Sequence, residues 1–240
     1  MSELLTLSAV ETHIGRYHIL HGVELGVPEG KTTMLLGRNG AGKTTTLRTI
    51  MGLWRASAGE IRLSGERIEA LSTPDIARAG IRYVPETMAV FSDLTVKENL
   101  ILAVRDGEMD QTRLDWIFGF FPPLKKFWLS RAGTLSGGQK QMLSFARSLI
   151  EPRRLLLIDE PTKGLAPAII GALIDCLKEV KRRGATILLV EQNFRVAQEI
   201  GDAVSVMDNG RVVHTGTMAA LASNQQLQHR LLGLSLDTHQ

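Results

Sequence analysis

The stretch GRNGAGKTT, Gly37 to Thr45, decides which fold this sequence can adopt. It matches the pattern G-x-x-x-x-G-K-[ST], and it lies between a strand-like run, TTMLLG, and a helical run, TTTLRTIMGLW. In this context the glycines allow backbone amides to surround a phosphate. We expect the Lys43 ammonium to contact the β- and γ-phosphates of a nucleotide, and the Thr44 hydroxyl to bind Mg²⁺. The predicted phosphate site comprises Gly37, Arg38, Asn39, Gly40, Ala41, Gly42, Lys43, Thr44 and Thr45.

A second motif, LLLIDE, ends a buried strand with two acids, Asp159 and Glu160. Ligands of parallel α/β sheets bind beyond the carboxyl ends of the strands. Asp159 is therefore placed to hold Mg²⁺ through water, and Glu160 to polarise an attacking water molecule. A solvated pair of acids at a strand end is the alternative. The phosphate loop in the same chain favours the catalytic interpretation.

The order of strand and helix patterns predicts the organisation of the chain. Strands alternate with helices, which is typical of an α/β fold with a parallel or mixed sheet. The first thirty residues read as strands and turns, and we expect an N-terminal antiparallel β-subdomain there. Helical patterns dominate the middle of the chain and predict an inserted helical subdomain. The expected division is one domain over 1–235, with a core at 1–87 and 151–220, a helical subdomain at 88–150 and a helical tail at 221–240.

The composition limits the classes of partner. The 28 basic and 25 acidic residues give a net charge of +3, which is too balanced to favour nucleic acid. Because there is only one cysteine, an internal disulfide is impossible, and a reducing compartment fits. We expect neither a signal peptide nor a membrane-spanning segment, since no apolar window is long enough. Work at a membrane would require a partner that holds the chain there.

A second glycine-containing loop, LSGGQ, precedes another helical run. Together with GRNGAGKTT and LLLIDEPT, and in this order, it resembles the signature of ATP-binding cassette (ABC) ATPases. In that family two cassettes face each other head to tail, and the LSGGQ of one closes over the γ-phosphate bound by the other. The resemblance implies that ATP is also contacted in trans by Leu135, Ser136, Gly137, Gly138 and Gln139. Ser136 could equally serve as a helix N-cap.

Three positions depart from the usual family pattern. Glu86, in YVPET, occupies the position of a glutamine that contacts Mg²⁺ and signals to the membrane partner. It can still accept from metal-bound water, but it adds negative charge near Asp159. Ala166, in KGLAP, replaces an aspartate that communicates across the dimer. Gln192, in VEQN, replaces a histidine that reaches the γ-phosphate; it can donate a hydrogen bond but cannot become cationic.

These departures resemble the ATPases of branched-chain (hydrophobic) amino acid importers and their urea and amide relatives. The resemblance implies an ATP-hydrolysing subunit on the cytoplasmic face of the membrane, held there by permease subunits and served indirectly by a substrate-binding protein. It also implies a second ABC ATPase subunit, which we expect to be a different chain. Urea, short amides and aromatic acids remain open as substrates. An ABC ATPase that acts on nucleic acid or ribosomes, and a simple kinase or GTPase, are the rival interpretations.

The sequence leaves the roles of two aromatic features undecided. The family stacks adenine on an aromatic residue before the phosphate loop, where this chain has Ile14; nearby Tyr17 could substitute, or could be an unliganded strand residue. The aromatic cluster from Trp116 to Trp128 could form the core of the helical subdomain or a docking groove. We expect residues around 86–91 and some of 118–128, with Phe120 or Phe121 among them, to meet the permease.

Overall fold

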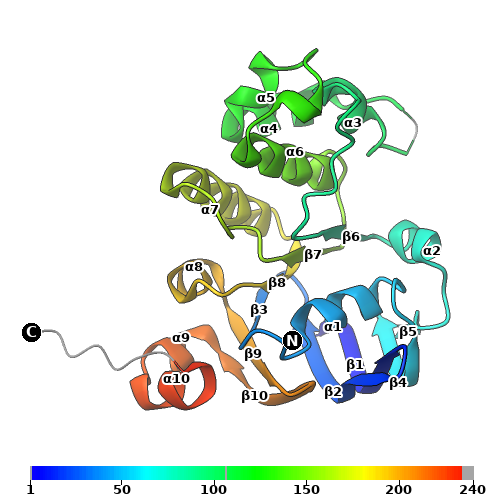
Figure 1. The fold of residues 1–240 in the computed structure, drawn as a ribbon, viewed down its shortest axis with the longest axis vertical. Coiled ribbons are helices and arrows are strands. Elements are labelled where there is room, and N and C mark those ends of the chain that lie inside the picture. Colours follow the sequence, from blue (N-terminus) through cyan, green and yellow to red (C-terminus); the bar gives the residue numbers. More distant parts are fainter. Residues whose placement is uncertain (1, 106, 234–240) are drawn as a thin grey trace, which may run out of the picture.

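The computed structural model describes residues 2–105 and 107–233 of the chain, and Figure 1 shows two lobes. Part of the lower lobe is an antiparallel sheet with the strand order β2-β1-β4-β5. Its strands are β1 (Glu3–Ile14), β2 (Tyr17–Pro28), β4 (Ala56–Leu63) and β5 (Glu66–Arg67). The predicted N-terminal antiparallel sheet is therefore confirmed, and it extends to include the hairpin that turns at Ser64 and Gly65.

The central sheet has six strands in the order β10-β9-β3-β8-β7-β6. Five strands run parallel, and β10 pairs antiparallel with β9 at the edge, so the sheet is mixed. The unbroken apolar runs of β7 and β8 are buried throughout, as expected for strands covered on both faces. The strands are β3 (Thr32–Gly37), β6 (Ile81–Val84), β7 (Leu155–Asp159), β8 (Thr186–Val190), β9 (Ala203–Asp208) and β10 (Arg211–Thr217).

Helices cover both faces of this sheet and complete the predicted α/β fold (Figure 1). Those of the core are α1 (Lys43–Ile50), α2 (Thr73–Arg78), α7 (Pro167–Arg182), α8 (Phe194–Ile200), α9 (Met218–Ala222) and α10 (Gln225–Leu232). Helix α10 lies within the predicted helical tail, of which positions 234–240 lie outside the described residues. Within 2–105 and 107–233, no helix is both long and apolar enough to cross a membrane.

The upper lobe is the predicted helical subdomain. It contains α3 (Val96–Ile101), α4 (Gln111–Phe120), α5 (Pro122–Lys126), a 3₁₀ turn (Ala132–Thr134) and α6 (Gly137–Leu149). Capping boxes fix the starts of α3 and α6: the hydroxyls of Thr95 and Ser136 accept from the backbone amides of Glu98 and Gln139. In return, the side chains of Glu98 and Gln139 accept hydrogen bonds from the backbone amides of the two cap residues.

The aromatic cluster is mainly core. Phe121 is fully buried and Phe118 nearly so, whereas Trp116, Phe120 and Trp128 are half-buried against the same apolar cluster. Of the two phenylalanines named as permease contacts, Phe121 is therefore excluded, and Phe120 stays a prediction. The Phe121 ring has no free face, because the turn between α4 and α5 directs it inward.

Candidate nucleotide site

The phosphate loop joins β3 to α1. Gly37 has a φ of 143°, and a Cβ placed there would lie 2.2 Å from the carbonyl oxygen of Met207 in β9, so only glycine fits. Gly42, with a φ of 102°, caps the N-terminus of α1, which has no acidic residue in its first turn. The first amides of α1 and its dipole therefore face the loop without a competing carboxylate, as an anion site requires.

Lys43 is the buried cation of the loop. Its ammonium donates to the carbonyl oxygens of Gly37, at 2.9 Å, and Arg38, at 3.0 Å. Burial lowers the pKa of Lys43, while the negative charges of Glu160 and Asp159 oppose that shift. The side chain is thus folded over the loop that would surround a phosphate, and a phosphate oxygen could replace the two carbonyls as its partner.

Asp159 lies at the carboxyl end of β7, fully buried, and it bridges two other residues. Thr44 donates its hydroxyl to one carboxylate oxygen at 3.0 Å, and Tyr83 donates to the other at 3.0 Å. Burial raises the pKa of Asp159, and the two hydrogen bonds counter this by favouring the charged form. The hydroxyl and carboxylate oxygens brought together here are the hard donors that Mg²⁺ prefers.

Glu160 follows in a strained conformation, with a φ of 44° and its amide donating to the Val190 carbonyl at 2.9 Å. The Gln192 amide donates to its carboxylate at 2.7 Å. On its other side Lys163 lies 3.5 Å from Glu160 and 2.7 Å from Glu86. The structure therefore brings together the predicted Glu160, Gln192 and Glu86, with a lysine between the two glutamates.

Glu191 and Lys163 support this group, and neither was predicted from the sequence. Glu191 is a buried residue directly after β8. Its carboxylate accepts from the Thr162 hydroxyl at 2.5 Å and from the backbone N–H of Gln192 at 2.9 Å. It thereby ties the loop that carries Gln192 to the segment that follows Glu160. A cavity of about 230 Å³ is lined by Glu160, Thr162, Lys163, Glu191, Gln192 and Asn193. A carboxylate after an unbroken apolar strand was the sequence signal that could have identified Glu191.

Ala166, the third departure, caps α7 without any side-chain hydrogen bond, and Pro167 follows as the first helical residue. An aspartate there could accept from the amides of the first turn, whereas alanine leaves them unpartnered by a side chain. The family's aspartate thus has no structural substitute at this position.

The LSGGQ loop lies at the start of α6 in the upper lobe, whereas the phosphate loop lies at the start of α1 in the lower lobe (Figure 1). Leu135 is buried, while Ser136 and Gly137 are exposed. A Cβ at Gly138 would lie 2.0 Å from the end of the Ile169 side chain of α7, so Ile169 would have to shift to accommodate any other residue. The structure thus presents the loop outward and does not bring it to the chain's own phosphate site.

Ile14 and Tyr17 are paired in register at the end of the β1–β2 hairpin, so their side chains lie on the same face. Thr12, two residues before Ile14, bonds Thr49 of α1 at 3.1 Å, and the pairing of β1 with β2 shifts register directly after Thr12. Tyr17 is 61% exposed, with the Arg16 guanidinium 5.3 Å from its ring centre.

The fold and the site together define an ATPase built on a phosphate-binding loop with an inserted helical subdomain. The family model for the ABC transporter matches residues 20–163, and the chain belongs to that family as its ATP-binding cassette. It is 41% identical to the high-affinity branched-chain amino acid transport ATP-binding protein BraG of Pseudomonas aeruginosa, over 96% of this chain and 100% of that protein.

Other relatives agree with this assignment. The probable branched-chain amino acid transport ATP-binding protein LivF of Archaeoglobus fulgidus is 37% identical, over 90% of this chain and 93% of that protein. A solved structure of the ATP-binding subunit of an ABC transporter superimposes with a TM-score of 0.82 at 33% identity, covering 98% of this chain and 96% of that one. The family resemblance and the fold predicted from the sequence are therefore confirmed.

Proposed function

We propose that this chain hydrolyses ATP in an importer of branched-chain or other hydrophobic amino acids. The hydrolytic part of the proposal rests on Asp159, Glu160 and Gln192, which lie at the carboxyl ends of β7 and β8. Thr44 of the phosphate loop bonds Asp159 there. The amino acid specificity is supported by the full-length similarity to BraG. Import of urea, short amides or aromatic acids is the alternative.

Each residue has a distinct part in the proposed reaction. The loop amides and Lys43 bind the β- and γ-phosphates, while Thr44 and Asp159 hold Mg²⁺. Bound there, the ion would neutralise charge that develops on the phosphate oxygens. Glu160 polarises the attacking water, and Gln192 keeps its carboxylate oriented. The adenine packs on Tyr17 or Ile14, which are paired in register at the end of the β1–β2 hairpin.

The complete site needs a second cassette. The chain's own LSGGQ loop faces outward from the other lobe, which supports binding of its Ser136 and glycine amides to ATP held by the partner. We propose that the partner is a different chain. Glu86, Ala166 and Gln192 make this chain's own site chemically unusual, whereas its LSGGQ loop is intact, so the two sites of the dimer would not be equivalent.

Permease subunits would hold the dimer at the cytoplasmic face of the membrane. The loop between β6 and α3 is the proposed contact: Phe91 is 49% exposed there, although Asn99 fixes its backbone through two hydrogen bonds. The Arg147 guanidinium of α6 lies 4.9 Å from the Phe91 ring centre. An exposed aromatic ring on a fixed backbone is suited to receive a short helix of a partner.

Trapping of the closed dimer tests the hydrolytic proposal. Glu160→Gln should abolish hydrolysis while leaving ATP binding intact, so that ATP and Mg²⁺ produce a stable dimer on a sizing column. The partner cassette is supplied in the same mixture. A monomer at saturating ATP would contradict the proposed site, and Lys43→Ala, which should bind ATP poorly, serves as the control that remains monomeric.

Uptake by intact cells tests the substrate class separately. Cells that lack this chain should lose uptake of radiolabelled leucine, and the wild-type chain but not Glu160→Gln should restore it. If leucine uptake is unchanged while uptake of urea or of an aromatic acid such as benzoate falls, the substrate assignment is wrong and the ATPase assignment stands.

A further inference from the structure

A second cavity, unrelated to the phosphate loop, lies where the helical subdomain meets the core. It encloses about 160 Å³ and is lined by α4, by the segment between α6 and β7, and by the end of α7. Because one water molecule occupies about 30 Å³ in the liquid, the space suits a ligand of only a handful of non-hydrogen atoms. Its position between α4 and α7, which pack against each other, gives it walls from both lobes.

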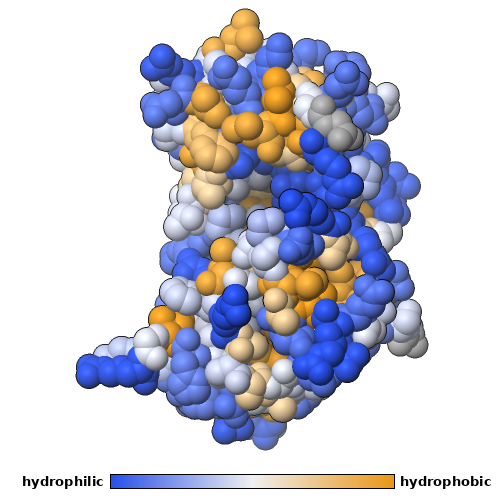
Figure 2. Space-filling model, turned by 90° about the vertical axis from the view of Figure 1, so that its right-hand side faces the viewer, coloured by the Kyte–Doolittle hydropathy of each residue, from blue (hydrophilic) through white to orange (hydrophobic). Residues whose placement is uncertain are grey.

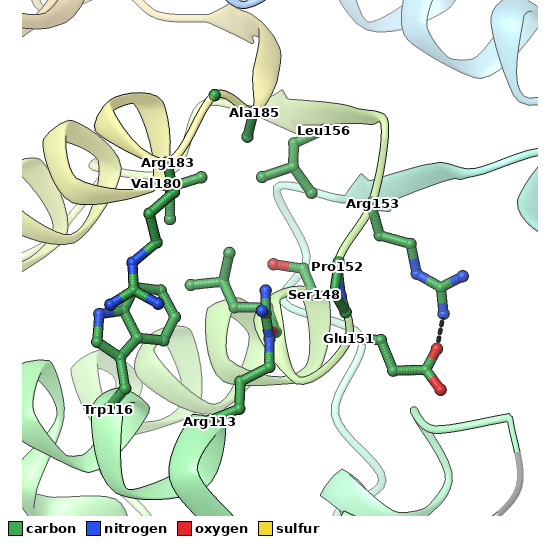
Figure 3. Close-up of a pocket in the computed structure, with 12 residues that line it drawn as sticks. Arg113, Trp116, Ser148, Glu151, Pro152, Arg153, Leu156, Val180, Arg183 and Ala185 are labelled. Atoms are coloured by element: carbon green, nitrogen blue, oxygen red, sulfur yellow. Dashed lines mark hydrogen bonds and ion pairs between the residues drawn. The ribbon is translucent and has the colours of Figure 1, made fainter. Parts of the chain in front are cut away.

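Two arginines share one indole ring in this cavity. Figure 3 shows the Arg183 guanidinium lying over Trp116, with Arg113 rising beside it from α4. The guanidinium carbons lie 4.4 Å and 5.7 Å from the ring centre, respectively. Burial lowers the pKa of Arg113, and the positive charge of Arg183 lowers it further. The two cations therefore repel each other across this space, and an anion placed between them would relieve that repulsion.

Most of the donors of these arginines are free. The Nε atom of Arg113 donates to the Leu149 carbonyl, and that of Arg183 donates to the Glu179 carboxylate at 2.8 Å in an ion pair that leaves its terminal nitrogens unused. Over residues 2–105 and 107–233, no hydrogen bond engages the terminal nitrogens of either side chain. These four nitrogens have the planar fork geometry that binds carboxylates.

The carboxylate already in the cavity wall cannot supply this partner. Glu151 forms an ion pair with Arg153, which Figure 3 shows on the far side of the cavity, and it also accepts from the Arg105 amide at 2.7 Å. The lining thus carries three guanidinium groups and one carboxylate, and that carboxylate is already paired. The remaining walls include the apolar side chains of Leu156 and Val180, together with Ser148, whose hydroxyl donates to the Phe145 carbonyl at 2.7 Å.

We propose that this cavity binds a small aliphatic carboxylate. The carboxylate would sit between the terminal nitrogens of Arg113 and Arg183, with its short apolar chain against Leu156 and Val180. Such a ligand neutralises the opposed guanidinium groups and fills a space too small for a nucleotide. The cavity shares no residue with the proposed catalytic group, so occupancy would not compete with ATP. It would instead connect α4 of the upper lobe to α7 of the lower lobe.

Titration of the purified chain with 3-methylbutanoate tests the proposal. Binding should change the emission of Trp116 in a saturable way, and Trp116→Phe should remove that change while Trp54 and Trp128 remain. The neutral 3-methylbutanamide should not bind, because it cannot satisfy two cations. Sulfate, which has charge but no apolar part, should bind more weakly. If the amide or sulfate binds as tightly as 3-methylbutanoate, the proposed chemistry of the ligand is wrong.

The arginine variants locate the site by calorimetry. Arg183→Gln should weaken binding of 3-methylbutanoate roughly ten-fold or more, since it removes a charge-assisted contact. Arg182→Gln is the matched control, because Arg182 bonds the same Glu179 at 2.7 Å but does not line the cavity. Circular dichroism confirms that each variant is folded. Equal affinities for the wild type and Arg183→Gln, equal losses in both variants, or no binding by the wild type well above millimolar concentration would overturn the proposal.

Discussion

At the scale of single residues, one lysine compensates for a departure from the family pattern. Glu86 adds a carboxylate near Asp159 and Glu160, and Lys163 lies between the two glutamates. The hydrogen bond to Glu86 and the charge of Glu160 hold the pKa of Lys163 above its ordinary value, so its positive charge persists through the neutral range. The lysine thereby links the residue at the proposed permease contact to the residue proposed to activate water.

Lys163→Met is predicted to lower the rate of ATP hydrolysis several-fold. Without the lysine, Glu86 and Glu160 repel each other, and the carboxylate of Glu160 loses one of the groups that orient it. Adding Glu86→Gln to this variant should restore part of the rate, because it removes the uncompensated charge. Steady-state hydrolysis in the presence of the partner cassette measures both effects.

A matched surface ion pair separates this positioning role from general charge effects. Lys178 pairs with Glu199 at 2.6 Å on α7 and α8, away from the phosphate loop. Lys178→Met should leave hydrolysis unchanged, and Lys163→Arg should retain most of it. A wild-type rate for Lys163→Met would show that Glu160 does not need this lysine.

At the scale of elements, two helices begin with the same capping motif, but the two motifs have different proposed roles. Both α3 and α6 start with a capping box, headed by Thr95 and Ser136 respectively. In α3 the cap only secures the helix, whereas in α6 the capping serine belongs to the loop proposed to close over the partner's ATP. The sequence permitted either role for Ser136, and the structure shows that the N-cap is real.

Ser136→Ala and Thr95→Ala are each predicted to lower the free energy of unfolding by about 1 kcal/mol, as loss of an N-cap does. Urea denaturation monitored by circular dichroism measures this. Of the two variants, only Ser136→Ala should also weaken the ATP-dependent dimer with the partner cassette. Equal dimer formation by both would confine Ser136 to capping.

At the scale of the whole molecule, the two lobes divide the work between them. Figure 2 shows hydrophobic residues gathered on the surface of the upper lobe and again on the lower lobe, with a hydrophilic band between them. The phosphate loop belongs to the lower lobe and the LSGGQ loop to the upper one, so a head-to-tail pair of cassettes would bring unlike lobes together. The proposed permease contact at Phe91 lies on the connection that leads from β6 into the upper lobe.

Phe91→Ser is predicted to leave the fold intact but to reduce recruitment to membranes that contain the permease, because it removes an exposed aromatic contact. Co-sedimentation with such membranes measures recruitment. Leu71→Ser is the control, since Leu71 is also exposed but lies between β5 and α2. If both variants are recruited equally, the permease does not bind at Phe91. Phe121→Ser would not be informative, because losing a fully buried phenylalanine costs about 3–5 kcal/mol of stability.

The sequence by itself determined the fold class and the chemistry of the phosphate site. The pattern from Gly37 to Thr45 requires a strand before it and a helix after it, and the apolar run from Leu155 requires helices on both faces of its sheet. The local spacing of residues was therefore sufficient to predict an α/β fold with a phosphate loop. These features depend on neighbours within a few residues, and the chain carries that information directly.

Only the tertiary structure decided which side chains meet across long separations. The ion pair of Glu86 with Lys163, the bond of Glu191 to Thr162 and the stacking of Arg183 on Trp116 each join segments at least 29 residues apart. The tertiary structure also decided that the Phe121 side chain is buried, because its position in the helical pattern fitted either a buried or an exposed ring. Such contacts depend on how strands are ordered in the sheet and how helices cross, and no periodicity in the sequence records either.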